Sequence, residues 1–142
     1  PTDSLMFAGN VAFLDTDTAD LIINGTDLSG SKLRQAPETS YNLLATYNQE
    51  TGFGDINYQL EFSHVDEQLM DYVQPLTVIQ EHSLLDARIG WTSTDSQWEV
   101  AIWGKNLTED DYISHSYVIG PGVIGVWGPP RTYGINVIWN LN

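Results

Sequence analysis

The sequence predicts an all-β fold, an antiparallel up-and-down meander of about six strands. Three observations support this prediction: apolar and polar residues alternate with a period of two, long and short connections alternate along the chain, and aromatic residues gather near the short connections. A period of two places successive side chains on opposite faces of a strand. The expected strands are residues 5–16, 41–49, 55–64, 82–92, 97–105 and 131–141.

The first expected strand has the weakest alternation of the six, with Phe7, Val11 and Phe13 on one face. Residues 17–39 then form a long connection rich in Asp, Gly, Ser and Thr, which are typical of loops. A short apolar run at residues 21–23 is expected as a small strand or a tucked loop.

The second and third strands form the clearest hairpin. In residues 41–49, Tyr, Leu, Ala and Tyr share one face. In residues 55–64 one face carries four apolar residues and a histidine, and the other face is polar at every position. The turn between them, residues 50–54, contains two glycines that supply positive φ.

The remaining strands follow the same pattern. Residues 82–92 and 97–105 are joined by a tight turn at residues 93–96, and residues 106–130 form a connection heavy in Gly, Pro and acids. A double proline then precedes the last strand, because proline has no N–H to give to a sheet ladder. In that strand Tyr133, Ile135, Val137, Trp139 and Leu141 share one face.

The connections alternate in length. Those at residues 17–39, 65–81 and 106–130 are long, whereas those at 50–54 and 93–96 are short. Long connections are unusual in compact domains, and an antiparallel meander with all its short turns at one end explains them. This is the anatomy of an outer-membrane-type barrel, whose strands of about 9–11 residues match the expected lengths.

Six aromatic residues lie within a few positions of a short turn or of the last residue, and the meander places them at one level. A belt of Trp and Tyr at one height is typical of a membrane interface. The alternative is ordinary core aromatics in a soluble β-sandwich, which needs no such clustering. The residues of this predicted belt are Tyr47, Phe53, Tyr58, Trp91, Trp98 and Trp139.

The opposite strand faces are polar at mid-strand, and the sequence leaves open which face lies inside a barrel. A small soluble barrel fills its interior with apolar side chains, whereas a large membrane barrel inverts that arrangement. The polar mid-strand residues are Asn57, Gln59, Glu61, Asp86, Arg88 and Asn136.

Composition excludes several classes of protein. With 5 basic and 19 acidic residues the formal net charge is −14, which argues against a nucleic-acid partner. Cysteine is absent, so the chain has no disulfide framework and no thiolate metal site. No apolar run approaches the ~20 residues of a membrane-spanning helix. The first residues carry no initiator methionine and no apolar signal segment.

We expect neither an enzyme nor a cofactor. Asp15, Asp17 and Asp20 suggest a calcium loop, but the glycine and final glutamate of such a loop are not in place. His64 with Asp66 and Glu67 could hold a divalent metal, although nothing in the sequence brings His82 or His115 to them. No Ser/His/Asp arrangement, phosphate loop or catalytic carboxylate pair stands out, and no metal site is predicted.

Three short motifs resemble the TonB-dependent outer-membrane receptors over their C-terminal portion. Residues 30–40 (GSKLRQAPETS), 98–112 (WEVAIWGKNLTEDDY) and 129–134 (PPRTYG) follow one another in the order and spacing of that family. The resemblance extends from residue 30 to the end of the chain. The residues that carry it are Ala36, Pro37, Gly104, Lys105, Asn106, Leu107, Tyr112, Pro130, Arg131, Tyr133 and Gly134.

The resemblance implies that residues 1–142 are the C-terminal segment of a 22-stranded barrel, with the plug domain and the earlier strands absent. It implies uptake of a scarce nutrient, such as a siderophore or other metal chelate, cobalamin or a glycan, across the outer membrane of a Gram-negative bacterium. The implied partners are outer-membrane lipid, the remainder of the barrel and the plug domain. The TonB energy-coupling complex would act through the missing N-terminal part.

The last strand also resembles the signal read by the outer-membrane barrel assembly machinery, at Thr132, Gly134, Val137 and Trp139. Lys105, Asn106 and Arg131 are interpreted structurally: an Asn at a strand end satisfies nearby backbone groups, and Arg131 can pair with one of the acids at 109–111. Two other hypotheses remain: a free-standing small β-barrel or sandwich that binds a ligand in solution, and a porin or adhesin barrel fragment.

Overall fold

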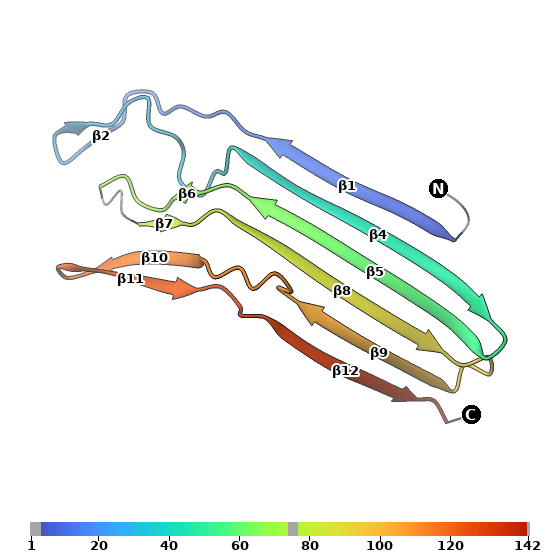
Figure 1. Cartoon of the computed structure of the whole chain (residues 1–142). Coiled ribbons are helices and arrows are strands. Elements are labelled where there is room, and N and C mark those ends of the chain that lie inside the picture. The colour runs from blue at the N-terminus through green and yellow to red at the C-terminus, as the bar shows by residue number, and fades with distance from the viewer. Residues whose placement is uncertain (1–3, 74–76, 142) are drawn as a thin grey trace.

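Six long strands form one antiparallel sheet in the computed structural model, which describes residues 4–73 and 77–141. Their order in the sheet is their order in the sequence (Figure 1), so the predicted meander is confirmed. The strands are β1 (Leu5–Phe13), β4 (Thr39–Thr51), β5 (Gly54–Val65), β8 (His82–Thr92), β9 (Trp98–Lys105) and β12 (Thr132–Trp139).

The strand bounds agree with the predicted ranges to within two residues at each end, except at the first strand. β8 has the predicted bounds, and β4 is longer than expected at both ends. β1 stops at Phe13, not at residue 16, because its last partner is Thr39, where β4 begins. Pro37 precedes that position and has no N–H with which to extend the ladder.

Each long connection holds a small hairpin. The small strand considered for residues 21–23 is present at Ile22–Ile23, whereas the hairpins in the other two connections were not predicted. The largest hairpin lies within the third long connection. There Gly120, with a φ of 57°, turns the chain between two apolar runs. Such runs on either side of a glycine-containing turn form a β-hairpin. The hairpins are β2 (Ile22–Ile23) with β3 (Thr26–Asp27), β6 (Gln68–Leu69) with β7 (Val78–Ile79), and β10 (Ile113–Ile119) with β11 (Gly122–Trp127).

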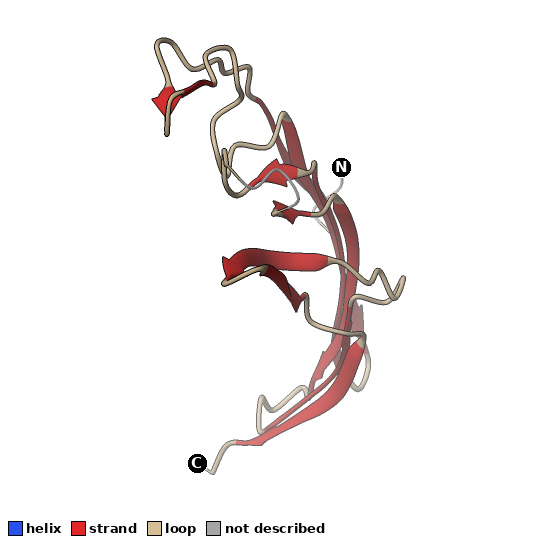
Figure 2. Ribbon diagram, turned by 90° about the vertical axis from the view of Figure 1, so that its left-hand side faces the viewer, coloured by secondary structure: helices blue, strands red, loops and turns tan. Residues whose placement is uncertain are grey.

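The sheet is a single curved layer. The turns that join β4 to β5 and β8 to β9 lie at one end, and the three long connections lie at the other (Figure 1). Viewed from the long-connection end, the sheet forms an arc, and the β10–β11 hairpin projects from its concave side (Figure 2).

Almost nothing in the described part of the chain forms a hydrophobic core. The buried hydrophobic residues there are Met70, Ala101 and Tyr112, and two of these lie in connections. Large apolar side chains on the strands are instead exposed, among them Phe13 (77%) and Tyr133 (81%). Within residues 4–73 and 77–141, no helix is long and apolar enough to cross a membrane.

Candidate functional site

The two faces of the sheet differ in chemistry along their whole width. The strand register places most of the apolar residues of the six strands on one face, whereas Met6, Leu44, Leu84, Trp103 and Ile138 lie on the other. Across the middle of that face each residue is either apolar or a glycine, and none is charged. The residues of this apolar band are Phe7, Gly9, Val11, Leu43, Ala45, Leu60, Leu85, Ala87, Ile89, Val100, Ile102, Gly104, Ile135 and Val137.

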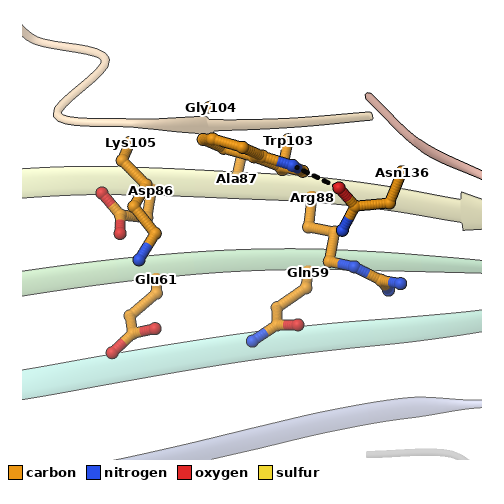
Figure 3. Close-up of a pocket in the computed structure, with 9 residues that line it drawn as sticks. All are labelled: Gln59, Glu61, Asp86, Ala87, Arg88, Trp103, Gly104, Lys105 and Asn136. Carbon is orange, nitrogen blue, oxygen red and sulfur yellow. Dashed lines mark hydrogen bonds between the residues drawn. The ribbon is translucent and has the colours of Figure 1, made fainter. Parts of the chain in front are cut away.

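The polar face is the concave one. In Figure 3 β9 lies above β8, the reverse of Figure 1, while β8 points to the right in both, so the two figures view opposite sides of the sheet. The polar side chains of Figure 3 therefore stand on the side hidden in Figure 1. Figure 2 turns that hidden side to the left, where the arc is concave. The apolar band consequently covers the convex side.

The predicted belt residues line the short-turn end of the convex side. Tyr47 pairs with Tyr58 across β4 and β5, and their rings stack with centroids 5.9 Å apart. Trp98 pairs with Trp139 across β9 and β12, and their rings stack at 5.6 Å. Trp91 lies between these pairs on β8, opposite residues 56 and 100 on its two neighbours.

Phe53 differs from the other belt residues because it lies in the turn between β4 and β5. Its side chain is 63% exposed. It therefore extends the row of aromatic residues beyond the end of the sheet.

A second aromatic row lies at the long-connection end of the same convex side. It was not found in the sequence, because only the strand pairing shows that its members follow one another across this face, with an offset along the ladder from strand to strand. Tyr41 of β4 contacts Phe62 of β5 with ring centroids 6.0 Å apart. Phe13 is the last residue of β1 and Tyr133 the second residue of β12, and both lie on this face. The apolar band is thus bordered by aromatic side chains at both ends.

Asn106 organises the start of the third long connection. It is 3% exposed and has a φ of 49°. Its Nδ2 donates to the carbonyl oxygens of Asp110 (2.9 Å) and Pro129 (3.1 Å), and its Oδ1 accepts from the Asp110 N–H at 2.9 Å. Its own N–H donates to Asp86 Oδ1 at 2.9 Å. One side chain therefore ties the beginning of this connection to its end.

Other residues of the same motif pack around Asn106. Leu107 donates its N–H to the Leu85 carbonyl at 2.8 Å and covers Gly104, where a Cβ would lie 2.6 Å from Leu107 Cδ2. Tyr112 is 7% exposed, and its ring stacks on His82 with centroids 3.9 Å apart. Burial, and secondarily the Asp110 carboxylate, raise the pKa of the Tyr112 hydroxyl.

The second motif (residues 98–112) and the third motif (residues 129–134) contact each other at the long-connection end of β9 and β12. Arg131 Nη2 lies 3.1 Å from Glu109 Oε1, one of the three acids expected as its partner. Thr132 pairs with Lys105 in the ladder, while Pro130 immediately precedes Arg131.

The remaining motif positions lie elsewhere. Ala36 and Pro37 precede β4, four strands away from β12 in the sheet order. Of the assembly-signal residues, Val137 and Trp139 are 60% and 57% exposed on the convex side. Gly134 is on the concave side beneath the Trp103 ring.

The structure brings together a Ser, a His and an Asp that the sequence did not indicate. His64 Nδ1 lies 2.8 Å from Ser83 Oγ, and His64 Nε2 lies 3.0 Å from Asp66 Oδ1. The hydrogen bond from His64 lowers the pKa of Asp66. The His64 ring also stacks on Tyr41 at 5.0 Å, at the border of the apolar band. This chain of hydrogen bonds joins the ends of β5 and β8, and His64 and Ser83 are 19 positions apart in sequence.

The concave face carries a polar cavity of about 390 Å³ (Figure 3). Two of its acids are held by hydrogen bonds: Glu61 Oε1 accepts from Asn42 Nδ2 at 2.6 Å, and Asp86 accepts from Asn106 as described. The lining residues are Gln59, Glu61, Asp86, Ala87, Arg88, Trp103, Gly104, Lys105 and Asn136. Most of the predicted polar mid-strand residues are therefore gathered in one place.

Among residues 4–73 and 77–141, no group of three or more His, Asp or Glu side chains is placed to hold a metal ion. His64 and Asp66 are engaged with each other, and Ser83 occupies the second ring nitrogen of His64.

The turn between β8 and β9 is held by one carboxylate. Asp95 Oδ1 accepts from Ser93 Oγ at 2.6 Å and from the Gln97 N–H at 3.0 Å. These hydrogen bonds, the Ser93 hydroxyl first, lower the pKa of Asp95. The stabilisation is therefore fully present above the unfolded-state pKa of about 3.9 and is lost as the pH falls through the lower folded-state pKa.

We expect an Asp95→Asn variant to be less stable than the native chain at neutral pH and equally stable at strongly acidic pH. Urea unfolding of both chains between pH 7 and acidic pH measures this difference. A difference that grows on acidification would contradict the assignment. A Ser93→Ala variant should show the same trend, because it removes the largest cause of the pKa shift.

Comparison with known proteins gives a match in fold. Neither the protein-family models nor the curated proteins match the sequence. Among solved structures, the ferric yersiniabactin uptake receptor FyuA from Yersinia pestis superposes with a TM-score of 0.85 at 17% sequence identity, covering 99% of this chain and 22% of that one. BauA, the ferric preacinetobactin receptor from Acinetobacter baumannii, gives a TM-score of 0.74 at 18% identity, covering 98% of this chain and 20% of that one.

The chain thus spans about a fifth of the length of these receptors. Its sheet, with short turns at one end and long connections at the other, has the architecture of a segment of an outer-membrane β-barrel. More particularly, its fold is that of a barrel segment of a TonB-dependent receptor.

Proposed function

We propose that the chain forms part of the barrel wall of an outer-membrane uptake receptor. In this proposal the convex apolar band faces lipid and the concave polar face lines the lumen. The substrate is a scarce nutrient carried as a ferric or other metal chelate, and energy is supplied by the TonB complex. The plug domain and the remaining barrel strands are the partners of this segment.

One observation carries the proposal. The apolar face is convex and uncovered, while the polar face is concave. A soluble sandwich or small barrel closes its apolar face onto a core. An uncharged apolar band bordered by aromatic side chains at both ends matches the lipid-facing surface of an outer-membrane barrel. The uncovered apolar face therefore argues against the hypothesis of a free-standing soluble barrel or sandwich that binds a ligand.

A passive porin wall would have the same two faces. What favours the receptor is the fold match to two ferric-chelate receptors together with the three motifs, two of which meet around Asn106. The same two receptors favour a metal chelate over cobalamin or a glycan as the substrate.

The uptake proposal is tested in cells that carry the gene for this chain. Deleting the gene should abolish growth on, and accumulation of iron from, at least one ferric chelate under iron limitation. Collapse of the proton-motive force in the undeleted strain should produce the same loss, because active transport requires it. Unchanged accumulation of every ferric chelate after deletion would contradict the proposal.

If the convex side faces lipid, truncating a side chain of β12 should lower the free energy of unfolding more on the convex side than on the concave side. In a lipid bilayer, Trp139→Ala should lower the free energy of unfolding by about 1.5–3 kcal/mol, because Trp139 lies on the lipid side and is buried there. Ile138→Ala, on the adjacent concave position, should cost about 0.5 kcal/mol or less. Urea unfolding of the chain in liposomes measures both effects, and equal losses would contradict the assignment of the faces.

A further inference from the structure

The convex side of the sheet is hollowed over β9, between β8 and β12. A cavity of about 420 Å³ lies there, which we call the convex groove. Two small residues at its centre, Ala87 and Gly104, are direct partners in the β8–β9 ladder. The strand residues of the convex side that line the groove are Ala87, Ile89, Ile102, Gly104, Tyr133 and Ile135.

Bulkier side chains stand on both sides of the central pair. Toward the short turns, Ile89 is the partner of Ile102, which is in turn the partner of Ile135. Toward the long connections, Leu107 lies over Gly104, because its Cδ2 would be 2.6 Å from a Cβ at that glycine. The groove is therefore bordered along the strands in both directions and open outward.

The groove offers almost no hydrogen bonds to an occupant. The strand beneath it, β9, is paired with a neighbour on each side. Among the convex residues that line the groove, Tyr133 alone has a polar side-chain atom. Arg88 and Trp103 also line it, but their side chains stand on the concave side (Figure 3). A polar group placed in the groove would lose its water without gaining a partner, so the groove fits a hydrocarbon.

We propose that the convex groove binds one acyl chain of a membrane lipid. The proposal rests on the proposed function, because that function places the convex apolar band against the bilayer. The groove is continuous with that band, and Tyr133 belongs to the aromatic row at its long-connection end. An amphipathic ring in such a row lies at the level of the lipid headgroups. The acyl chain therefore enters beside Tyr133 and runs over Gly104 and Ala87.

Packing gives this acyl chain a preference for the groove over the rest of the band. On a flat apolar surface a chain contacts protein atoms along one side, whereas in the groove it also contacts Ile102 and Leu107 on its flanks. Each such contact is weak, but their sum is not. The surrounding lipid is as apolar as these side chains, so burial of apolar surface adds nothing. We therefore expect a preference of several-fold, in exchange with the surrounding lipid.

The test uses the full chain refolded in vesicles of dioleoylphosphatidylcholine that contain a fraction of phosphatidylcholine with a diazirine in one acyl chain. Light releases dinitrogen and leaves a carbene, which inserts into a C–H bond that it contacts. Mass spectrometry of the digested chain then locates the links. Links at Ile135 should exceed those at Phe7, which lies on the other edge strand of the same face with nearly the same exposure, 65% against 68%.

Ala87→Leu fills the groove with a side chain of the protein itself. The links at Ile102 and Ile135 should then fall about threefold or more, the equivalent of about 0.7 kcal/mol of lost packing. Ala87→Val fills less of the groove and should give a smaller decrease. Circular dichroism and protease resistance in the vesicles verify that each variant is folded.

Ala45→Leu is the matched control. Ala45 lies on the same row of the convex face, because Leu60 is the ladder partner of both Ala45 and Ala87, but it does not line the groove. This variant should leave the links at Ile102 and Ile135 unchanged.

Three results would overturn the proposal. The first is equal linking at Ile135 and Phe7, and the second is an unchanged pattern in Ala87→Leu. The third is a loss of links in the groove as the ratio of protein to lipid rises, which would assign the groove to a second copy of the chain. Even linking over the convex side would remove the site and leave the proposed function standing. Linking at Gln59 as strong as at Leu60 would contradict both.

Discussion

Gly54→Ala is expected to lower the free energy of unfolding of the chain by about 3 kcal/mol or more. Gly54 begins β5 with a φ of 137°, a conformation that residues with a Cβ rarely adopt. The added Cβ would overlap the Thr92 carbonyl oxygen and lie 2.6 Å from Trp91 Nε1. Backbone strain and overpacking each cost about 1–3 kcal/mol, and both act here.

Gly52 provides the matched control, because it lies in the same turn with no atom within 4 Å of its added Cβ. Urea unfolding of Gly52→Ala and Gly54→Ala in detergent micelles compares the two positions. The Gly52 variant should stay within about 0.5 kcal/mol of the native chain. Equal midpoints for the two variants would show that the β4–β5 turn is not packed against the end of β8 as described.

Asn106→Ala is expected to cost about 2–4 kcal/mol. The substitution leaves the carbonyl oxygens of Asp110 and Pro129 and the Asp110 N–H without their partner. Each buried group left without a hydrogen bond costs about 1–3 kcal/mol, although water can reach part of this site. The β10–β11 hairpin should also lose protection against hydrogen exchange, because Asn106 joins the two ends of the connection that carries it.

Asn48 gives a control of the same residue type. Its Oδ1 accepts from Asn57 Nδ2 at 2.6 Å, but the pair is exposed, so Asn48→Ala should cost about 0.5 kcal/mol. Hydrogen exchange and urea unfolding measure both variants. If Asn106→Ala is no less stable than Asn48→Ala, the motif asparagine does not organise the connection.

The long strands were predictable because their faces differ at nearly every position. Residues 55–64 alternate without exception, and β5 covers all of them. β1 was placed three residues too long, because its end depends on where its partner begins. The β10–β11 hairpin is not predictable from composition, because Gly and Pro are typical of loops and here form the turn between two apolar runs.

Less of the candidate site could be predicted, because it depends on strand register. The belt at the short-turn end could be predicted, because the sequence gives the number of residues between each aromatic residue and the nearest short turn. The row of Phe13, Tyr41, Phe62 and Tyr133 requires the pairing of strands far apart in sequence. Asn106 and Arg131 were marked by their motifs, but no pattern within one strand shows that Arg88 lies over Gly90.

The central claim, that the convex face meets lipid and the concave face meets water, is tested directly by site-directed spin labelling of β5. The chain has no cysteine, so single cysteines at Gln59, Leu60, Glu61 and Phe62 carry the label without background. In liposomes, labels at 60 and 62 should collide with oxygen dissolved in the bilayer, and labels at 59 and 61 with a water-soluble paramagnetic reagent. The reverse alternation, or equal exposure of all four positions to the water-soluble reagent, would contradict the account.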